Sequence, residues 1–176
     1  MNQRGVSKKT WTVALSGVLA ALSLAFLYLA SVLPTGQLGI AAVAGLFPMA
    51  AVVSAGWKAG LCCWIAAGLL GLLVVPGKGV ALLFLLFFGL YPVVKSLIER
   101  LRKLVPEWIC KLILFNADLW VCLQVAGGIL LDSMPVQLQQ LWLLWPVLNV
   151  VFICYDTGLS KLAKVYMVRV DQRLRK

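Results

Sequence analysis

The stretch WTVALSGVLAALSLAFLYLASVL, residues 11–33, contains no charged side chain. A transmembrane helix needs roughly 20 mainly apolar residues, and this run provides them. The run follows the basic residues Arg4, Lys8 and Lys9, and the apolar core of a signal peptide also follows basic residues. That core has roughly 7–15 residues, however, and this run is longer. We therefore interpret it as an uncleaved first membrane span.

Five further apolar runs follow, so the sequence predicts an all-α membrane protein with a bundle of six transmembrane helices. Residues 1–176 form a single integral membrane domain in this interpretation. Gly56–Gly60 is so short that the second and third spans form either a tight helical hairpin or a re-entrant segment. The predicted spans are residues 11–33, 38–55, 59–75, 80–98, 108–131 and 138–155, with a basic loop at 95–111 and a basic tail at 156–176.

The composition supports this class of protein. Hydrophobic residues make up 62% of the chain and charged residues 12%, against about 25% charged in soluble domains. The chain has no histidine, which removes the commonest metal ligand and general base. Its five cysteines lie in or against apolar runs, and we interpret them as packing residues. We therefore expect neither an enzyme nor a bound cofactor or metal.

The distribution of basic residues predicts the orientation. Lys and Arg are enriched in the cytoplasmic loops of membrane proteins. If the N-terminus is inside, Lys78 is the one outer residue among the 16 Lys and Arg. We therefore expect a multi-pass protein of the bacterial inner membrane with both termini in the cytoplasm. The expected inner residues are Arg4, Lys8, Lys9, Lys58, Lys95, Arg100, Arg102, Lys103, Lys111, Lys161, Lys164, Arg169, Arg173, Arg175 and Lys176.

The net charge of +10 is concentrated in the loop at 95–111 and in the tail. The favoured interpretation is that these segments lie on the anionic inner leaflet of the lipid bilayer, where each basic residue contributes roughly 1 kcal/mol. Docking of a protein partner is the alternative. We do not expect a nucleic-acid partner.

Polar and aromatic side chains form one stripe on each of the last two predicted spans. Because residues three or four apart share a helix face, the stripes predict an outward-facing pocket for a small organic ligand. Interfacial tryptophans and interhelical amide hydrogen bonds are the alternative explanation. The stripes are Asn116, Trp120 and Gln124 on the fifth span, and Trp142, Trp145, Asn149, Phe152 and Asp156 on the sixth; from these we select Trp120, Gln124, Trp142, Trp145 and Asn149 as candidate binding residues.

Asp118 lies near the middle of the fifth span, about 200° around the helix from Asn116. A carboxyl group buried there without a partner is expected to hold a proton. One interpretation is a proton-coupling residue. The interpretation we prefer is a packing residue that bonds to a neighbouring backbone or hydroxyl group.

Small residues recur on the first span. Gly17, Ala21 and Ala25 form a small-xxx-small ladder, and Ser16 and Ala20 widen it. Such ladders let helix backbones approach closely inside a membrane. They serve either packing within the bundle or docking of a separate membrane protein.

Chain length, span count, the Ala21-xxx-Ala25 pair and the loops Pro34–Gln37 and Pro76–Gly79 resemble the substrate-binding (S) component of energy-coupling factor transporters, which import vitamins. The resemblance implies ligand capture from the outer side. It also implies docking, through Gly17, Ala21 and Ala25, on a membrane coupling (T) subunit that carries two ATP-binding subunits. The chain has no Walker A sequence, so ATP hydrolysis falls to those partners. The competing hypothesis is a non-transporting membrane scaffold that acts through its basic loop and tail.

Overall fold

The computed structural model describes residues 3–99, 104–131 and 138–168. All regular structure in these ranges is helical, as the sequence predicts. The elements are α1 (Gln3–Val32), α2 (Gln37–Ala44), α3 (Leu46–Ala55), α4 (Trp57–Val74), α5 (Lys78–Leu83), the π-helical turn η1 (Phe84–Phe88), α6 (Leu90–Ile98), α7 (Leu104–Leu131) and α8 (Leu138–Tyr166).

Within the described residues, four helical segments are long and apolar enough to cross a membrane. They are Lys9–Val32, Gln37–Ala55, Trp57–Val74 and Lys78–Ile98. The second combines α2 with α3, and the fourth combines α5, η1 and α6. The bounds lie within a few residues of the first four predicted spans. The molecule is therefore an all-helical protein of a kind compatible with a membrane.

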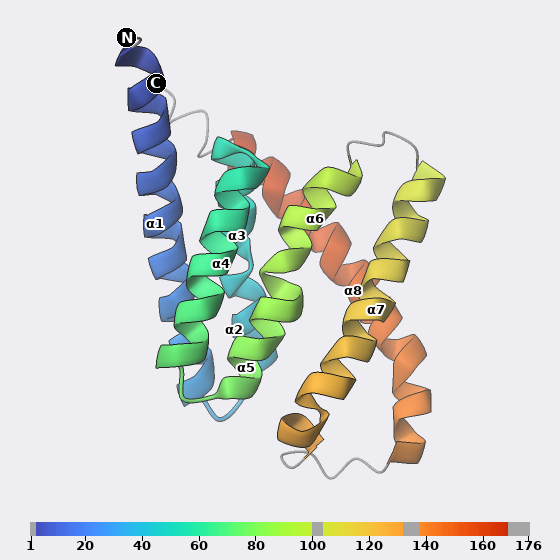
Figure 1. Ribbon diagram of the computed structural model, residues 1–176. Helices are drawn as coiled ribbons and strands as arrows, with labels where there is room; N and C mark the ends of the chain where they lie inside the picture. Colours follow the sequence, from blue (N-terminus) through green and yellow to red (C-terminus); the bar gives the residue numbers. More distant parts are fainter. Residues whose placement is uncertain (1–2, 100–103, 132–137, 169–176) are drawn as a thin grey trace.

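The first four segments pack closely because small residues line their contacts. α1 lies against α2, α3 and α4 (Figure 1). Small side chains let backbones approach each other where lipid offers no hydrophobic drive between helices. The buried small residues of this core include Ala20, Ala30, Ala41, Ala44, Ala51, Ala59, Cys63 and Ala67.

Two prolines inside these segments leave backbone carbonyls without their helical donor, because proline has no N–H. Pro48 frees the carbonyl of Ala44, and Oγ of Ser23 on α1 donates to that oxygen at 3.0 Å. Pro92 frees the carbonyl of Phe88, which lies against Gly45: a Cβ added there would be 2.4 Å from the Phe88 oxygen. The fold thus satisfies the carbonyl freed by Pro48 through a hydrogen bond from a neighbouring helix, and the carbonyl freed by Pro92 packs closely against Gly45.

The short connection between the second and third predicted spans is a tight hairpin. Gly56 alone separates α3 from α4, and its φ of 90° lies in the region that favours glycine. α3 and α4 pack along each other after this turn. Of the two interpretations left open by the sequence, the structure shows the hairpin.

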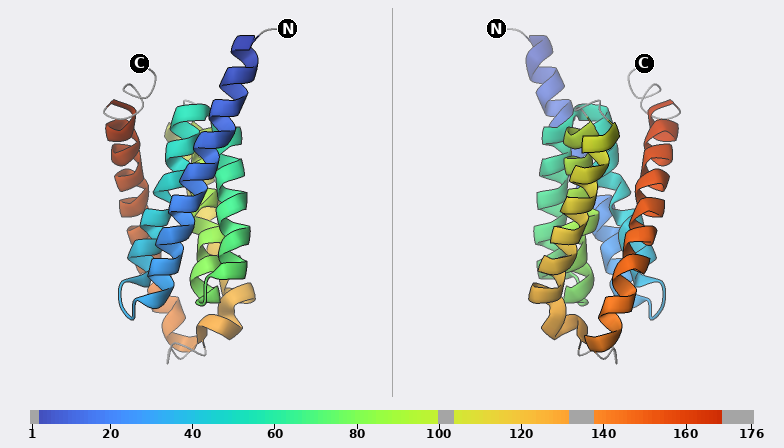
Figure 2. Two further views of the ribbon diagram at one scale, coloured as in Figure 1. Left: turned by 90° about the vertical axis from the view of Figure 1, so that its left-hand side faces the viewer. Right: turned by 90° about the vertical axis from the view of Figure 1, so that its right-hand side faces the viewer.

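α7 and α8 form the other side of the molecule (Figure 1). α8 crosses obliquely and reaches α3, where the hydroxyls of Ser54 and Tyr166 lie 3.0 Å apart. The C-terminal end of α8 and the N-terminal end of α1 lie at the same end of the bundle (Figure 2). A second core of Met49, Tyr91, Phe115, Phe152 and Leu159 joins α7 and α8 to the preceding helices.

Candidate functional site: an apolar pocket beside a buried ion cluster

Among the predicted binding residues whose side chains the structure describes, Trp120 and Gln124 lie on the exterior of α7. Trp120 is 59% exposed on the outside of α7, and Gln124 is exposed as well. The side chain of Trp142 lies outside the described residues. Residues that share a helix face in the sequence therefore do not all share one cavity, because that face also depends on which helix packs against it.

Trp145 and Asn149 instead hydrogen-bond with Asn116 between α7 and α8. Nε1 of Trp145 donates to Oδ1 of Asn116 at 2.7 Å. Nδ2 of Asn116 donates to Oδ1 of Asn149 at 3.1 Å. These are the interhelical bonds of the alternative explanation, so these two residues tie the helices together and do not line the pocket described below.

The ladder on α1 faces away from the bundle. Gly17, Ala21 and Ala25 are exposed, whereas Ser16 and Ala20 are buried. Oγ of Ser16 donates to the carbonyl of Ala59 at 3.3 Å, so the buried edge packs against α4. The exposed strip leaves the docking prediction open.

A pocket of about 390 Å³ lies where α2, α5 and η1 meet α7 and α8. This volume falls in the usual range of small-molecule sites. The pocket contains none of the five predicted binding residues. Its lining consists of Leu38, Gly39, Ala42, Leu83, Phe87, Phe88, Phe115, Asp118, Leu119, Cys122, Leu148, Val151, Phe152 and Tyr155.

Two polar groups of this lining are unsatisfied. Within the part of the chain that the structure describes, Oδ2 of Asp118 and Oη of Tyr155 are buried and have no hydrogen-bond partner. The packing interpretation of Asp118 expected a bond to a neighbour, and Oδ2 makes none. A buried polar atom without a partner costs about 1–3 kcal/mol, so this pocket is organised for something other than stability alone.

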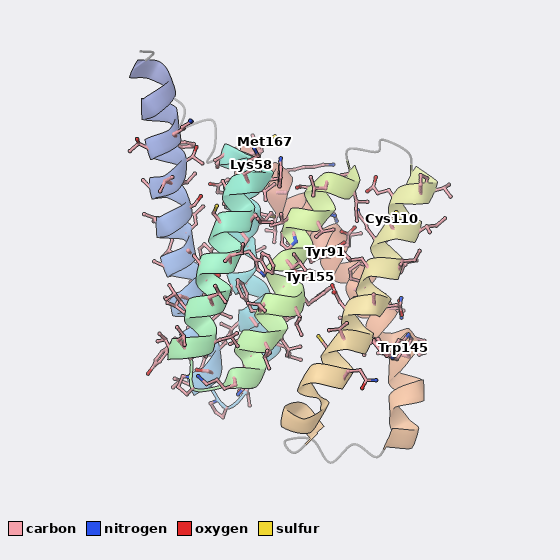
Figure 3. All side chains as sticks on the ribbon, viewed as in Figure 1. Lys58, Tyr91, Cys110, Trp145, Tyr155 and Met167 are labelled. Carbon is pink, nitrogen blue, oxygen red and sulfur yellow. The ribbon has the colours of Figure 1, made fainter. Side chains whose placement is uncertain are left out.

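Aromatic rings form one wall of the pocket. Phe115 and Phe152 stack with centroids 4.4 Å apart, and Phe87 lies 5.6 Å from Phe115. Behind this wall, Tyr91 stacks on Phe87 at 5.5 Å. Tyr91 and Tyr155 lie together in the interior, away from Trp145 (Figure 3).

Tyr91 connects the aromatic wall to a buried cluster of charges on α6, α7 and α8. Its hydroxyl donates to Oδ1 of Asp156 at 2.5 Å. Lys95 pairs with the same oxygen, and Nζ of Lys111 lies 3.2 Å from Oδ2. Glu99 and Glu107 complete the cluster, at 2.9 Å from Lys95 and 2.7 Å from Lys111 respectively.

This cluster corrects the prediction of a lipid-facing position for two residues of the basic loop, Lys95 and Lys111, whereas Arg100, Arg102 and Lys103 lie outside the described residues. Lys95 is 5% exposed and Lys111 is 2% exposed, so neither side chain lies on an outer surface. The predicted basic tail also begins inside a helix, since α8 continues to Tyr166 and Asp156 is buried in it. Two buried cations find partners only because three carboxylates converge on them.

A pattern in the sequence does mark these residues. Tyr91, Lys95 and Glu99 recur at intervals of four, and so do Glu107 and Lys111. That spacing brings side chains together on one face of a helix. Asp156 ends the stripe noted on the sixth span, but the sequence does not reveal which helix faces it.

In the described residues, no group of three or more His, Cys, Asp and Glu is arranged to hold a metal ion. Comparison of the chain with protein-family models, with curated proteins and with solved structures gave no match.

Proposed function

We propose that this chain is a six-span protein of the bacterial inner membrane that captures a small, largely apolar ligand from the outer side for import. In this proposal it acts as the substrate-binding subunit of an importer of the energy-coupling factor type. ATP is hydrolysed by partner subunits that dock on it through a membrane coupling subunit.

The pocket is the observation that carries the proposal. Its volume of about 390 Å³ lies in the usual range of small-molecule sites, and its two unsatisfied polar atoms offer hydrogen-bonding positions to a ligand. Leu38 and Gly39 at the start of α2 belong to its lining, near the end of the bundle where α1 connects to α2. In the proposed orientation that end faces outward, which suits capture from outside.

The helix lengths support six spans. α7 has 28 residues and α8 has 29, so each is about 40 Å long at 1.5 Å per residue. The hydrocarbon core of a bilayer is about 30 Å thick. When α7 and α8 are counted with the four apolar segments, the chain crosses the membrane six times. The N-terminal end of α1 and the C-terminal end of α8 then lie on the same side of the membrane, as two cytoplasmic termini require.

The surface of α1 supports docking of a membrane partner. Gly17, Ala21 and Ala25 are exposed, and a groove of about 260 Å³ between α1 and α4 runs beside Gly17 and Lys58. Small residues beside a groove allow a partner helix to approach closely. The scaffold hypothesis has less support, because Lys95 and Lys111 of its proposed interaction surface are buried.

Purification of the tagged full-length protein from its native host in mild detergent tests this proposal. We expect a membrane coupling subunit and ATP-binding subunits to co-purify. Ala21→Trp should remove them, because the indole fills the space that a partner helix needs. Leu22→Trp is the matched control: Leu22 is exposed on the same helix but about 100° away from Ala21.

Co-purification that survives Ala21→Trp would contradict docking on the α1 strip. Recovery of cell-envelope assembly proteins, with no ATP-binding subunit, would replace the importer by the scaffold hypothesis.

A further inference from the structure

We propose that the ligand of the pocket is a protonated organic amine: a compact apolar body that carries one ammonium group, which pairs with Asp118. This inference rests on the proposed capture function and specifies the class of ligand. It follows from three features of the pocket, namely one carboxyl group, the surrounding aromatic rings and the absence of a basic residue from the lining.

The carboxyl group of Asp118 has no counter-charge in the pocket. None of the described residues that line the pocket is Lys or Arg. The two buried lysines nearest in the fold, Lys95 and Lys111, are already paired with Asp156, Glu99 and Glu107. A carboxyl group in apolar surroundings either holds a proton or has a positive charge beside it, and here the ligand is the group that can supply that charge.

The aromatic wall favours the same charge. Phe87, Phe88, Phe115, Phe152 and Tyr155 all belong to the lining. The face of an aromatic ring attracts a cation within about 6 Å of its centroid, and the attraction grows when the cation is desolvated. Rings around a single carboxylate therefore suit an organic cation with apolar substituents.

Hydrogen bonding distinguishes an amine from a quaternary ammonium. Oδ2 of Asp118 is buried in the pocket lining without a partner. A protonated amine offers an N–H donor to this oxygen, whereas a quaternary nitrogen offers none. If the Asp118 carboxyl group is protonated before the ligand binds, it releases that proton to water when the ammonium group pairs with it.

The other ligand charges fit poorly. An anion would meet the Asp118 carboxyl group with no basic residue in the lining to offset it. A neutral apolar ligand would fill the pocket but leave the buried oxygen without a partner, at a cost that an ammonium removes. The pocket therefore selects by charge as well as by shape.

Three probes with the same phenylethyl body test the inference on the purified full-length protein: 2-phenylethylamine, 2-phenylethanol and 3-phenylpropionate. Dissociation constants measured by ligand-observed NMR at pH 7 should place the amine at least about tenfold tighter than the alcohol, and the anion weakest. Asp118→Asn should remove the preference for the amine and leave binding of the alcohol within about twofold of wild type. Oδ2 of Asp118 has no partner to lose, so we expect the variant to fold, and its melting temperature serves as the control.

The outcomes separate this inference from the proposed function. If the alcohol binds as well as the amine in the wild type, or if the preference for the amine survives Asp118→Asn, then the amine class is wrong while the capture pocket stands. If none of the three probes binds to the wild type, then both the amine class and the capture pocket are overturned.

Discussion

Nζ of Lys111 on α7 lies 3.2 Å from Oδ2 of Asp156 on α8, although 45 positions separate the two residues. Lys95 from α6 pairs with the other oxygen of the same carboxylate. Asp156 therefore joins α6, α7 and α8. The cluster adjoins the aromatic wall of the pocket through Tyr91, so the position of α8 affects both sites.

Replacement of Asp156 by Asn is expected to destabilise the protein strongly. Lys95 and Lys111 would keep their charges but lose their shared carboxylate, and breaking a buried pair in this way costs about 3–5 kcal/mol. Unfolding in a detergent mixture, followed by circular dichroism, measures the loss. Glu99→Gln is the control, since the Glu99 side chain is 42% exposed and its pairs contribute about 0–1 kcal/mol. Equal losses for the two variants would argue against a buried cluster.

A larger side chain at Gly39, which lines the pocket, should weaken ligand binding without lowering the stability of the protein. A Cβ at Gly39 meets nothing within 4 Å, and Gly39 lines the pocket, so Gly39→Leu places its side chain into free space. We expect at least about tenfold weaker binding of 2-phenylethanol. Gly158→Leu is the matched control, because Gly158 is equally open but outside the pocket lining. Unchanged binding to Gly39→Leu would place the ligand elsewhere.

Gly45 and Gly39 should respond in opposite directions to alanine. A Cβ at Gly45 would lie 2.4 Å from the carbonyl oxygen of Phe88, so the backbone of η1 has to move. Overpacking of this kind costs about 1–3 kcal/mol. Gly39→Ala meets no atom and should gain up to about 1 kcal/mol from helix propensity. Melting temperatures of the two variants, measured side by side, check the prediction, and a neutral Gly45→Ala would contradict the close contact.

The bonds of Asn116 are expected to contribute more than the single bond of Trp145. Asn116→Ala leaves both Nε1 of Trp145 and the amide of Asn149 without their partner on α7. We expect a loss of about 1–2 kcal/mol, and about half of that for Trp145→Phe. In the double variant the losses should not add, because both substitutions remove the same bond. Strict additivity in the unfolding free energies would contradict the shared network.

Labelling with a membrane-impermeant maleimide should distinguish the two orientations. The five native cysteines are first replaced, by Ala at the buried Cys63 and Cys122 and by Ser elsewhere. Lys78→Cys should then react in intact cells, because Lys78 is exposed at the end of the bundle that we assign to the outside. Lys58→Cys, exposed at the opposite end, should react only after the cells are permeabilised. The reverse labelling pattern would mean that the protein has the opposite orientation in the membrane.

The sequence predicted the first four helical segments closely, because an uninterrupted apolar run marks a membrane-spanning helix directly. It also marked the turn at Gly56. The apolar run marks the sixth predicted span up to Tyr155 but not the end of the helix: a helix that leaves the apolar region has no reason to end there, and α8 continues to Tyr166.

The sites were harder to predict, because they depend on which helices face one another. Asn116 and Asn149 lie on the two stripes that the sequence marks, one on each of the last two spans, and they do bond to each other. The pocket residues Phe87 and Tyr155 gave no signal, since aromatic side chains are common throughout such a chain. The sequence analysis assigned Lys95 and Lys111 to the anionic inner leaflet because basic segments are attracted to anionic lipid. Only the folded arrangement shows that Asp156 neutralises both.

The π-helical turn η1 also affects where the chain can lose a residue without a change in helix phase. The N–H of Gly89 donates to the carbonyl of Phe84, five residues earlier, at 2.8 Å, so the turn holds one residue more than an α-helical turn. Deletion of one residue within Phe84–Phe88 would restore α-helical spacing and keep α5 and α6 in phase. The same deletion in the middle of α4 would rotate all that follows by about 100°. A one-residue deletion should therefore disturb the phase of the following helices less at this turn than in α4.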